Sequence, residues 1–370
     1  MSLLTINAGS SSLRLSLFKQ TRNGLVQLAK ARHDGIDRHE VSLLDEFITL
    51  VDASEITLVV HRVVHGGRRL TTPRLIDARV ETEIERLIPL APLHNPSALA
   101  WIRLARQLLG EQIPQAAVFD TAFYRSLPEV AATYALPRKL CQDYGIHRYG
   151  FHGIAHRAIW NRWREIRPGV PHGGRVISLQ LGAGCSITAI DQGAPVDTSM
   201  GFSPLEGLVM ATRSGDLDPT LITYLQRQAG LGTEEIEQIL NRQSGLLGLS
   251  GNSSDMRAVL DSDTPDARLA VDLYCYRVRK YIGAYLAVLG GADAILFGGG
   301  VGENSPQVRA KILQGMEWLG VELDTLHNND SVGKEACIST AKSSIEAWVI
   351  TVDEASIMAR EALDSISNDH

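Results

Sequence analysis

The sequence has little cysteine and no long apolar run, and each absence narrows the classes of protein it can represent. Four cysteines occur in 370 residues, and none forms a CxxC pair. Neither a disulfide framework nor a zinc site is therefore indicated, and we expect a protein of the reducing cytoplasm. The most apolar later stretch, LAVLGGADAILFGGGVG, is interrupted by glycines and by Asp293. It does not predict a membrane span, and no membrane partner is expected.

An excess of charge of either sign is also lacking. The chain has 36 basic and 42 acidic residues, a formal net charge of -6, and no long run of either sign. Nucleic acids and anionic membranes are bound by basic patches, so neither is predicted as a partner. The N-terminus lacks a basic region and its apolar character breaks at Asn7, which does not fit a secretory signal. Any anion must therefore be held by a local site.

The length exceeds what one hydrophobic core usually serves. A chain of 370 residues with 44% hydrophobic residues predicts two domains with well-built cores. We place the boundary in the region 145–175, which is rich in Gly, His and Pro. This gives domains 1–150 and 151–370, and the last helix, at about 353–367, could pack back on the first domain.

Two stretches share one pattern, an apolar strand followed by a turn of small residues and a second strand. The first is LTINAGSSSLRLSL, residues 4–17, in which apolar residues alternate on both sides of an Asn, a Gly and three serines. The second is RVISLQLGAGCSITAI, residues 175–190. Alternation of this kind predicts β-hairpins. Their offset of roughly half the chain predicts a duplicated domain with equivalent turns.

A third glycine cluster, AILFGGGVGENSPQVRAKIL, follows a different pattern. We predict a strand over 294–297, glycines at 298–300, and a helix that begins near Ser305 and Pro306, because proline is favoured at a first helical position. Further helices are predicted at PSALAWIRLARQLLG, DPTLITYLQRQAG and RLAVDLYCYRVRKYIGAYLAVLG. Strands that alternate with helices predict an α/β fold.

The glycine and serine turns favour phosphate as a ligand. Backbone N–H groups of such turns, together with hydroxyls, form a concave donor surface for phosphate oxygens. A single turn is weak evidence, because hairpins also use Asn, Gly and Ser for positive φ, but this chain has three. Neither GxxxxGK[ST] nor GxGxxG with a downstream acid is present, which disfavours P-loop and Rossmann sites.

Charged residues occur where turns are expected, and each also has a purely structural interpretation. Arg62 could be a strand-end surface charge, Asp120 could cap the helix of TAFYRSL, and His152 could be a packed histidine. Arg213 precedes Asp218 and Pro219, a good helix start. Taken together, two arginines and a histidine beside phosphate-binding turns match the positive charge that phosphoryl transfer requires.

In the segments that contain these residues, the sequence resembles the acetate kinase family. The matching segments, in order, are NAGSSSLRLSL, HRVVHGG, APLHNP, FDTAFYRSLP, RYGFHG, VDTSMGFSPLEGL, TRSGDLDP, GNSSDMR and FGGGVGEN. The resemblance implies the duplicated fold of actin, hexokinase and the Hsp70 ATPase domain, with two domains around a central cleft. It also implies an acetokinase-type N-terminal domain, a nucleotide-binding C-terminal domain, and a homodimer.

The reaction that the resemblance implies is reversible, direct in-line transfer of the ATP γ-phosphoryl group to acetate, giving acetyl phosphate and ADP. The attacking carboxylate is already ionised at neutral pH, so no general base is needed. By resemblance, Arg62 and Arg213 flank the acetate and the phosphoryl group, and His152 donates to it. Asp120 then orients an arginine or metal-bound water. Mg²⁺ or Mn²⁺ is the implied cofactor, with Asn7 and Glu354 on the metal side.

The resemblance also carries over binding residues. The acyl pocket would contain Arg62, Val64, Leu93, Phe151 and Pro204, although core packing alone predicts the same apolar types. The nucleotide and phosphate residues would be Asn7, Ser10, Ser12, Arg14, Gln180, Gly182, Ala183, Gly184, Asp255, Met256, Arg257, Gly300, Val301, Gly302 and Asn304. Glu354 could also simply complement a helix dipole.

The chain departs from the family pattern at one turn. Family members usually show HLGNGSS where this chain has QLGAGCS, so Gln180 and Ala183 replace a phosphate-contacting His and Asn. Arg14 replaces a usual Lys and keeps the charge. These departures bear on catalytic efficiency and on the phosphoryl donor more than on the fold.

Three alternatives remain open at this point. A propionate kinase is the nearest, because one methylene in an apolar pocket is worth only about 1 to 3 kcal/mol. A second is a family member that uses ATP poorly or takes another phosphoryl donor. The third is a degenerate nucleotide-binding sensor, against which the presence of Arg62, Asp120, His152 and Arg213 argues.

Overall fold

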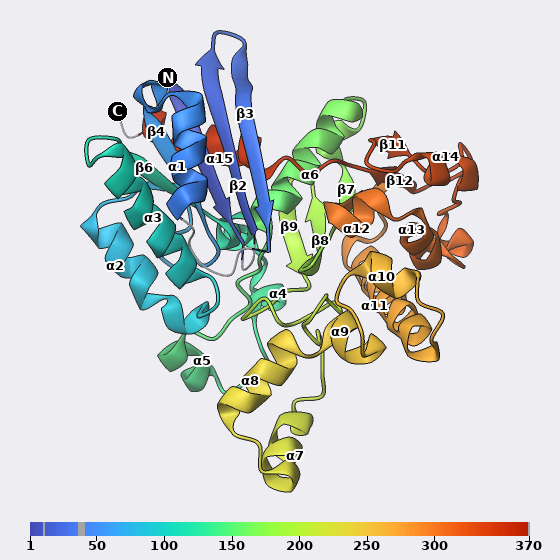
Figure 1. The fold of residues 1–370 in the computed structure, drawn as a ribbon. Helices are drawn as coiled ribbons and strands as arrows, with labels where there is room; N and C mark the ends of the chain where they lie inside the picture. The colour runs from blue at the N-terminus through green and yellow to red at the C-terminus, as the bar shows by residue number, and fades with distance from the viewer. Residues whose placement is uncertain (10–11, 36–40, 369–370) are drawn as a thin grey trace. The chain divides into compact units, whose positions relative to one another are not determined.

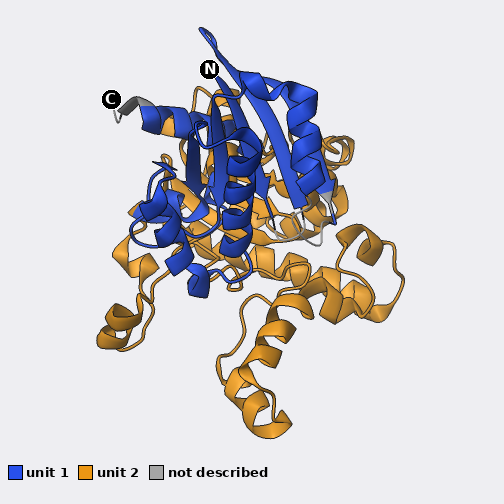
Figure 2. Ribbon diagram, turned by 60° about the vertical axis from the view of Figure 1, so that its left-hand side comes forward, with its two compact units in different colours: residues 1–125, 151–154, 353–370 blue, residues 126–150, 155–352 orange. Residues whose placement is uncertain are grey.

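The computed structural model describes residues 1–9, 12–35 and 41–368, and Ser10 lies outside them. The chain divides into two compact units, coloured blue and orange in Figure 2. The first contains residues 1–125, 151–154 and 353–370, and the second contains 126–150 and 155–352. By this grouping, 126–150 lie in the second unit, although the sequence analysis assigned them to the first domain. The C-terminal helix lies in the first unit.

The first unit is built on a six-stranded mixed sheet with the order β3-β2-β1-β4-β6-β5. Its strands are β1 Ser2–Ala8, β2 Ser12–Thr21, β3 Gly24–Asp34, β4 Leu58–Val63, β5 Arg74–Leu75 and β6 Gln115–Phe119. The strands β3, β2 and β1 pair antiparallel in turn, whereas β1, β4 and β6 run parallel. The short edge strand β5 is antiparallel to β6.

The second unit repeats this topology, with the order β11-β12-β10-β7-β8-β9. Its strands are β7 Arg175–Leu181, β8 Cys185–Asp191, β9 Ala194–Thr198, β10 Ala294–Gly298, β11 Ala336–Cys337 and β12 Glu346–Val349. The strands β9, β8 and β7 pair antiparallel, β7, β10 and β12 run parallel, and β11 is an antiparallel edge. The equivalence of the two sheets confirms the predicted duplication and the α/β class.

Helices cover both faces of the first sheet (Figure 1). They are α1 Val41–Val51, α2 Ala78–Arg86, α3 Asn95–Leu109 and α15 Glu354–Asn368. On one face, Leu4 and Ile6 pack with Phe47 of α1 and Trp101 of α3. Since side chains alternate along a strand, Asn7 points to the other face, where its side chain meets the start of α15.

The second unit contains most of the helices (Figure 1). They are α4 Glu129–Ala132, α5 Arg138–Tyr144, α6 Gly153–Ile166, α7 Thr220–Ala229, α8 Thr233–Arg242, α9 Gly245–Ser250, α10 Met256–Leu260, α11 Pro265–Leu289, α12 Gly299–Asn304, α13 Pro306–Leu313 and α14 Thr325–Asp330. The first two residues of α6 belong to the first unit. Short 3-10 helices lie at 53–55, 88–90, 120–126, 171–173 and 317–319. The long helix α11 packs against β7, β8 and β9.

The predicted helices α3, α7 and α11 are confirmed, and each ends at a glycine, Gly110, Gly230 or Gly290. The prediction for the third glycine cluster is partly wrong. The glycines themselves begin a helix, α12, ahead of the expected helix at Pro306. Glycine is a poor helix former, but a Cβ at residue 299 would lie 2.6 Å from the carbonyl oxygen of Leu181. Close packing on β7 therefore selects glycine here.

The four cysteines are free thiols. Within the described ranges, no helix has both the length and the apolar character needed to cross a membrane.

Candidate active site

A polar cluster of four side chains lies within the first unit, at one edge of its sheet. Arg62 Nη2 donates to Asp120 Oδ2 at 2.6 Å, and Arg62 Nε lies 3.0 Å from Oδ1. Arg62 Nη1 donates to Asn7 Oδ1 at 3.1 Å, and Asn7 Nδ2 donates to Glu354 Oε2 at 2.6 Å. Asn7 and Arg62 lie toward the carboxyl ends of β1 and β4, and Asp120 follows β6. Neighbouring parallel strands end at the same edge, where ligands of α/β sheets commonly bind.

The electrostatics of the cluster keep Arg62 charged. Burial lowers the pKa of Arg62, but the attraction of Asp120 and Glu354 outweighs it, so the net pKa is raised. Burial raises the pKa of Asp120, against the opposing effect of Arg62. The Asp120 side chain is fully buried and the Arg62 side chain is 12% exposed. Asp120 is therefore engaged in holding a guanidinium and is poorly placed to accept a proton from a substrate.

Glu354 is the carboxylate of this cluster that a metal could use. Its Oε2 accepts from Asn7 and lies 3.5 Å from Arg14 Nη1, while Oε1 has no hydrogen bond from the described chain. Mg²⁺ usually takes one or two carboxylates together with water and phosphate oxygens, which a single buried Glu fits. Asn7 orients Glu354 through its amide nitrogen. The described residues contain no group of three His, Cys, Asp or Glu that could hold a metal alone.

His152 lies next to this cluster through its backbone. Its N–H hydrogen-bonds to Asp120 and lowers the pKa of that carboxyl, and its φ is 58°. A positive φ is unusual for a non-glycine residue and is often found at functional sites. A Cβ at residue 153 would lie 2.1 Å from the carbonyl oxygen of Asp120. The Gly that follows His152 therefore permits this close approach.

The apolar residues assigned to the acyl pocket in the first unit differ in exposure. Val64 and Phe151 are buried, and Leu93 is 37% exposed. Phe151 packs edge-on against His65, the residue after Val64, at 5.5 Å between ring centroids.

The first glycine turn joins β1 to β2. Gly9 N donates to the carbonyl oxygen of Ser12 at 2.8 Å, and Ser12 begins β2. A Cβ at residue 9 would lie 2.8 Å from Ser12 Oγ. The Ser12 hydroxyl therefore lies close to the backbone of Gly9.

In the second unit, the equivalent turn of Gly182, Ala183 and Gly184 lies beside α12 and the segment that carries Arg213. The carbonyl oxygen of Ala183 accepts from Ala211 N at 3.0 Å. A Cβ at residue 302 would contact Leu181 at 3.7 Å, whereas a Cβ at residue 300 would meet nothing within 4 Å. A side chain at residue 300 would therefore meet open space, whereas residue 302 packs against β7.

Among the residues that the structure describes, Arg213 is a partly buried cation without an acidic partner. Its Nη1 donates to the carbonyl oxygen of Pro204 at 3.1 Å and lies 3.7 Å from Met210 Sδ. Burial lowers the pKa of Arg213, and within the described residues it forms no ion pair. Such a guanidinium has positive charge available for an anionic ligand.

The remaining nucleotide candidates lie around α10 and α12. Asp255 caps α10 and pairs with Arg257 at 2.7 Å, while Met256 is buried. Asn304 donates to the carbonyl oxygen of Gly300 at 2.9 Å, and Val301 lies between them in α12.

Sequence reasoning missed two buried side chains, one that joins the strands of the turn 182–184 and one that binds the end of α12. His156, on α6, is fully buried, with Nδ1 2.8 Å from Ser178 Oγ on β7 and Nε2 2.7 Å from Ser186 Oγ on β8. It thus bridges the two strands of the turn 182–184. Arg309 is also fully buried and donates to the carbonyl oxygens of Gly302 and Glu303 at the end of α12. Neither stood out, because a helical His or Arg is common on surfaces.

Two buried histidines predict an acid-sensitive fold. Burial lowers the pKa of His61 to about 4 and that of His156 to about 3, from 6.5. The unfolded chain takes up protons near pH 6.5 and the folded chain does not, so the free energy of unfolding should fall as the pH drops below 6.5. At about 1.4 kcal/mol per unit, each histidine should cost roughly 2 kcal/mol between pH 7 and pH 5.

Urea denaturation at pH 7, 6 and 5 measures this loss, above the range where most carboxylates titrate. A His61→Gln variant should show a shallower decline, while a variant of the exposed His327, His327→Gln, should decline like the parent. A stability that is flat between pH 7 and pH 5 would contradict the assignment.

Comparison with known proteins gives consistent matches. The model of the acetokinase family matches residues 26–360. An acetate kinase of Solibacter usitatus is 47% identical over 317 residues, which are 85% of this chain and 77% of that protein. The crystal structure of Porphyromonas gingivalis acetate kinase has a TM-score of 0.87 at 36% identity and covers 99% of both chains. A propionate kinase of Francisella tularensis has a TM-score of 0.87 at 35% identity and covers 98% of this chain and 99% of that chain.

Proposed function

The chain belongs to the acetokinase family, and we propose on this basis that it transfers the γ-phosphoryl group of ATP to acetate, reversibly, giving acetyl phosphate and ADP. A new bond joins a carboxylate oxygen of acetate to the γ-phosphorus as the bond to the β–γ bridging oxygen of ATP breaks. The electron pair of the broken bond leaves with ADP, so atoms and charge balance. Acetate is ionised at neutral pH, and no proton has to be removed.

The observation that best supports the proposal is that the guanidinium of Arg62 is held in place and kept charged. Asp120 holds its guanidinium by two oxygens and keeps it charged. A fixed cation of this kind is worth most where negative charge is spread over transferring oxygens. Arg62 and Arg213 serve the carboxylate and the phosphoryl group, and His152 donates to the phosphoryl group in the transition state. Asp120 is a positioning residue and not a base.

Mg²⁺ would neutralise the phosphate oxygens of the nucleotide, with Glu354 as its carboxylate and Asn7 holding Glu354 in place. The phosphates would lie against the turns at Gly9 and Ser12 and at Gly182 and Gly184. The adenosine would lie against the segments 255–257 and 300–304. A homodimer in the cytoplasm is the family expectation, and the exposed Leu221 and Tyr224 of α7 offer apolar surface for a second copy.

A hydroxamate assay tests the proposal directly. Purified protein should form hydroxylamine-trapped acyl phosphate from ATP and acetate in the presence of Mg²⁺. The phosphoryl donor is defined by offering pyrophosphate or GTP with acetate. The acceptor is defined by offering propionate or butyrate with ATP. Absence of acyl phosphate with every pair, while ATP still binds in calorimetry, would favour a nucleotide-binding sensor instead.

Propionate is a second candidate acceptor, because a propionate kinase matches this chain as well as an acetate kinase does in TM-score. We expect acetate and propionate to be used and butyrate to be poor. Replacing the buried Val64 with alanine opens a methyl-sized space. The butyrate-to-acetate ratio of kcat/KM should therefore rise about 10-fold or more.

The matched control is Val63→Ala. Val63 packs in the core with Ile84 and Phe119, so this variant should lose stability without changing the ratio. An unchanged ratio in Val64→Ala would remove Val64 from the acyl pocket.

A further inference from the structure

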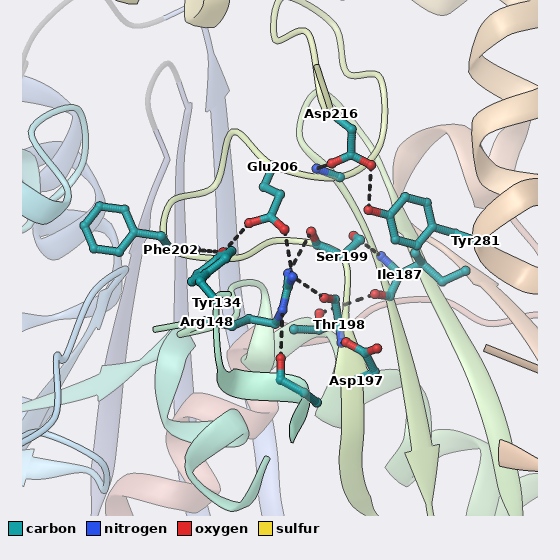
Figure 3. Close-up of polar contacts among 12 residues, drawn as sticks. Tyr134, Arg148, Ile187, Asp197, Thr198, Ser199, Phe202, Glu206, Asp216 and Tyr281 are labelled. Carbon is teal, nitrogen blue, oxygen red and sulfur yellow. Dashed lines mark hydrogen bonds and ion pairs between the residues drawn. The ribbon is translucent and has the colours of Figure 1, made fainter. Parts of the chain in front are cut away.

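A second polar cluster, drawn in Figure 3, lies wholly within the second unit and holds the segment 198–216. That segment carries both Pro204 and Arg213. Its centre is the carboxylate of Glu206. Arg148 Nη2 donates to Glu206 Oε1 at 2.7 Å, and the Tyr134 hydroxyl donates to Glu206 Oε2. The Arg148 guanidinium also lies over the Tyr134 ring, 5.5 Å from its centroid.

The side chains of Arg148 and Tyr134 also form hydrogen bonds with the backbone at the start of the segment 198–216. Arg148 Nη1 donates to the carbonyl oxygen of Thr198 at 3.0 Å, and Phe202 N donates to the Tyr134 hydroxyl at 2.8 Å. The carbonyl oxygen of Gly201 accepts from Tyr149 N at 3.0 Å. A Cβ at residue 201 would lie 1.7 Å from Glu206 Oε2, so the cluster also requires glycine there.

The charges of the cluster are balanced. Burial lowers the pKa of Arg148, but the attraction of Glu206 outweighs it, and the net pKa is raised. The Arg148 side chain is 17% exposed and that of Glu206 is 30% exposed. A partly buried ion pair with further hydrogen bonds on each partner resists rearrangement, and removal of one partner leaves the other poorly solvated.

The other end of the segment is anchored separately. Gly207 N donates to Asp216 Oδ1 and the Tyr281 hydroxyl donates to Asp216 Oδ2, both at 2.7 Å. Between the two anchors, Arg213 Nη1 donates to the carbonyl oxygen of Pro204, two residues from Glu206. The position of the Arg213 guanidinium is thus linked through Pro204 to the Tyr134–Arg148–Glu206 cluster.

We infer that Tyr134, Arg148 and Glu206 are positioning residues for phosphoryl transfer, which set the place of Pro204 and Arg213 and act on acyl use rather than on nucleotide binding. The inference rests on the proposed function. Among the described residues, no hydrogen bond or ion pair joins these three side chains to the nucleotide candidates 255–257 and 300–304. A displacement of about 1 Å at a reacting group costs on the order of 100-fold in rate.

Tyr134→Phe is the test, because it removes only the hydroxyl. We expect kcat/KM for acetate to fall roughly 10- to 100-fold, while the Kd for ATP in calorimetry stays within about twofold, a margin worth only about 0.4 kcal/mol. Glu206→Ala should show the same split, with partial recovery in Glu206→Gln, which keeps an acceptor oxygen. Tyr276→Phe on α11, a 60% exposed tyrosine, is the control and should match the parent.

Hydrogen exchange gives a readout that does not depend on turnover. The amide of Phe202 donates to the Tyr134 hydroxyl, so exchange in a peptide covering 198–207 should be faster in Tyr134→Phe than in the parent. If the parent itself makes no acyl phosphate, the proposed function fails and this exchange still tests the anchoring. Unchanged exchange, unchanged kcat/KM for acetate, or a parallel loss of ATP binding would each overturn the inference.

Discussion

Replacing Arg62 or Arg213 with alanine is expected to lower kcat by about 10²- to 10³-fold, the cost of removing one donor aimed at transition-state charge. Arg62 is preset by Asp120 and Asn7, and Arg213 has no acidic partner among the described residues to neutralise it. Arg62 is therefore already oriented for an anionic substrate, and the charge of Arg213 does not first have to leave a carboxylate partner. The hydroxamate assay at saturating ATP and acetate measures the loss.

The two variants should differ in stability, which separates a direct effect from a general one. Arg62→Ala leaves the fully buried Asp120 without its cation, and removing one partner of a buried pair costs about 3 to 5 kcal/mol. Arg213→Ala removes a partly buried cation that forms no ion pair with any described residue, so its Tm should stay level or rise. An inactive Arg213→Ala variant with an undiminished Tm would show that the arginine is needed for turnover alone.

Exposed arginines in the same units provide the controls. Arg69, 72% exposed, pairs only weakly with Glu83 in the first unit, and Arg227 lies on α7 in the second. Arg69→Ala and Arg227→Ala should keep the parent rate. If Arg62→Ala and Arg213→Ala also keep it, the transfer site has been assigned to the wrong residues.

The parts of the fold that follow from local sequence pattern could be predicted. Alternation around a glycine turn gave both hairpins, and glycine-ended amphipathic stretches gave α3, α7 and α11. The roles of Asn7, Arg62 and Asp120 could be proposed because each lies in a short motif that resembles the family. Glu354 was carried over by the same resemblance as a metal-side carboxylate. Local pattern and family motif therefore identify the residues that are proposed to contact the substrate.

What could not be predicted depends on contacts between distant segments. The glycine-rich helix α12 forms against the intrinsic preference of glycine because it packs on Leu181. Tyr134, Arg148 and Glu206 are 14 and 58 residues apart in sequence. Arg148 and Glu206 lie in the segments RYGFHG and VDTSMGFSPLEGL, but no local pattern indicates that they meet each other and Tyr134. The hydrogen bonds between 134–150 and 198–206 also explain why 126–150 group with the second unit.

The double variant Gln180→His with Ala183→Asn is expected to raise kcat/KM for ATP by roughly 10- to 1,000-fold at fixed acetate. Gln180 can offer a phosphate only a neutral amide, and its Oε1 is buried without a hydrogen bond from the described chain. Ala183 is exposed in the turn 182–184 and has no polar side-chain atom. A charge-assisted bond is about twice as strong as a neutral one, and a bond to a charged group contributes about 1.5 to 3 kcal/mol.

At position 180 the gain is about half of such a bond and at position 183 a whole one. Together these are about 2 to 4 kcal/mol, which at 1.4 kcal/mol per decade lies within the expected range. The parent should be slow but active, because the backbone of Gly182 and Gly184 is unchanged. The single variants Gln180→His and Ala183→Asn show how much of the gain in kcat/KM for ATP each substitution contributes. The KM for acetate at saturating ATP should stay constant. An already efficient parent and a double variant that is no faster with ATP would mean that Arg14 or water replaces the lost contacts. A parent that prefers pyrophosphate would mean instead that the two substitutions accompany a change of donor, since pyrophosphate needs the phosphate-binding turns but not the adenosine segments 255–257 and 300–304.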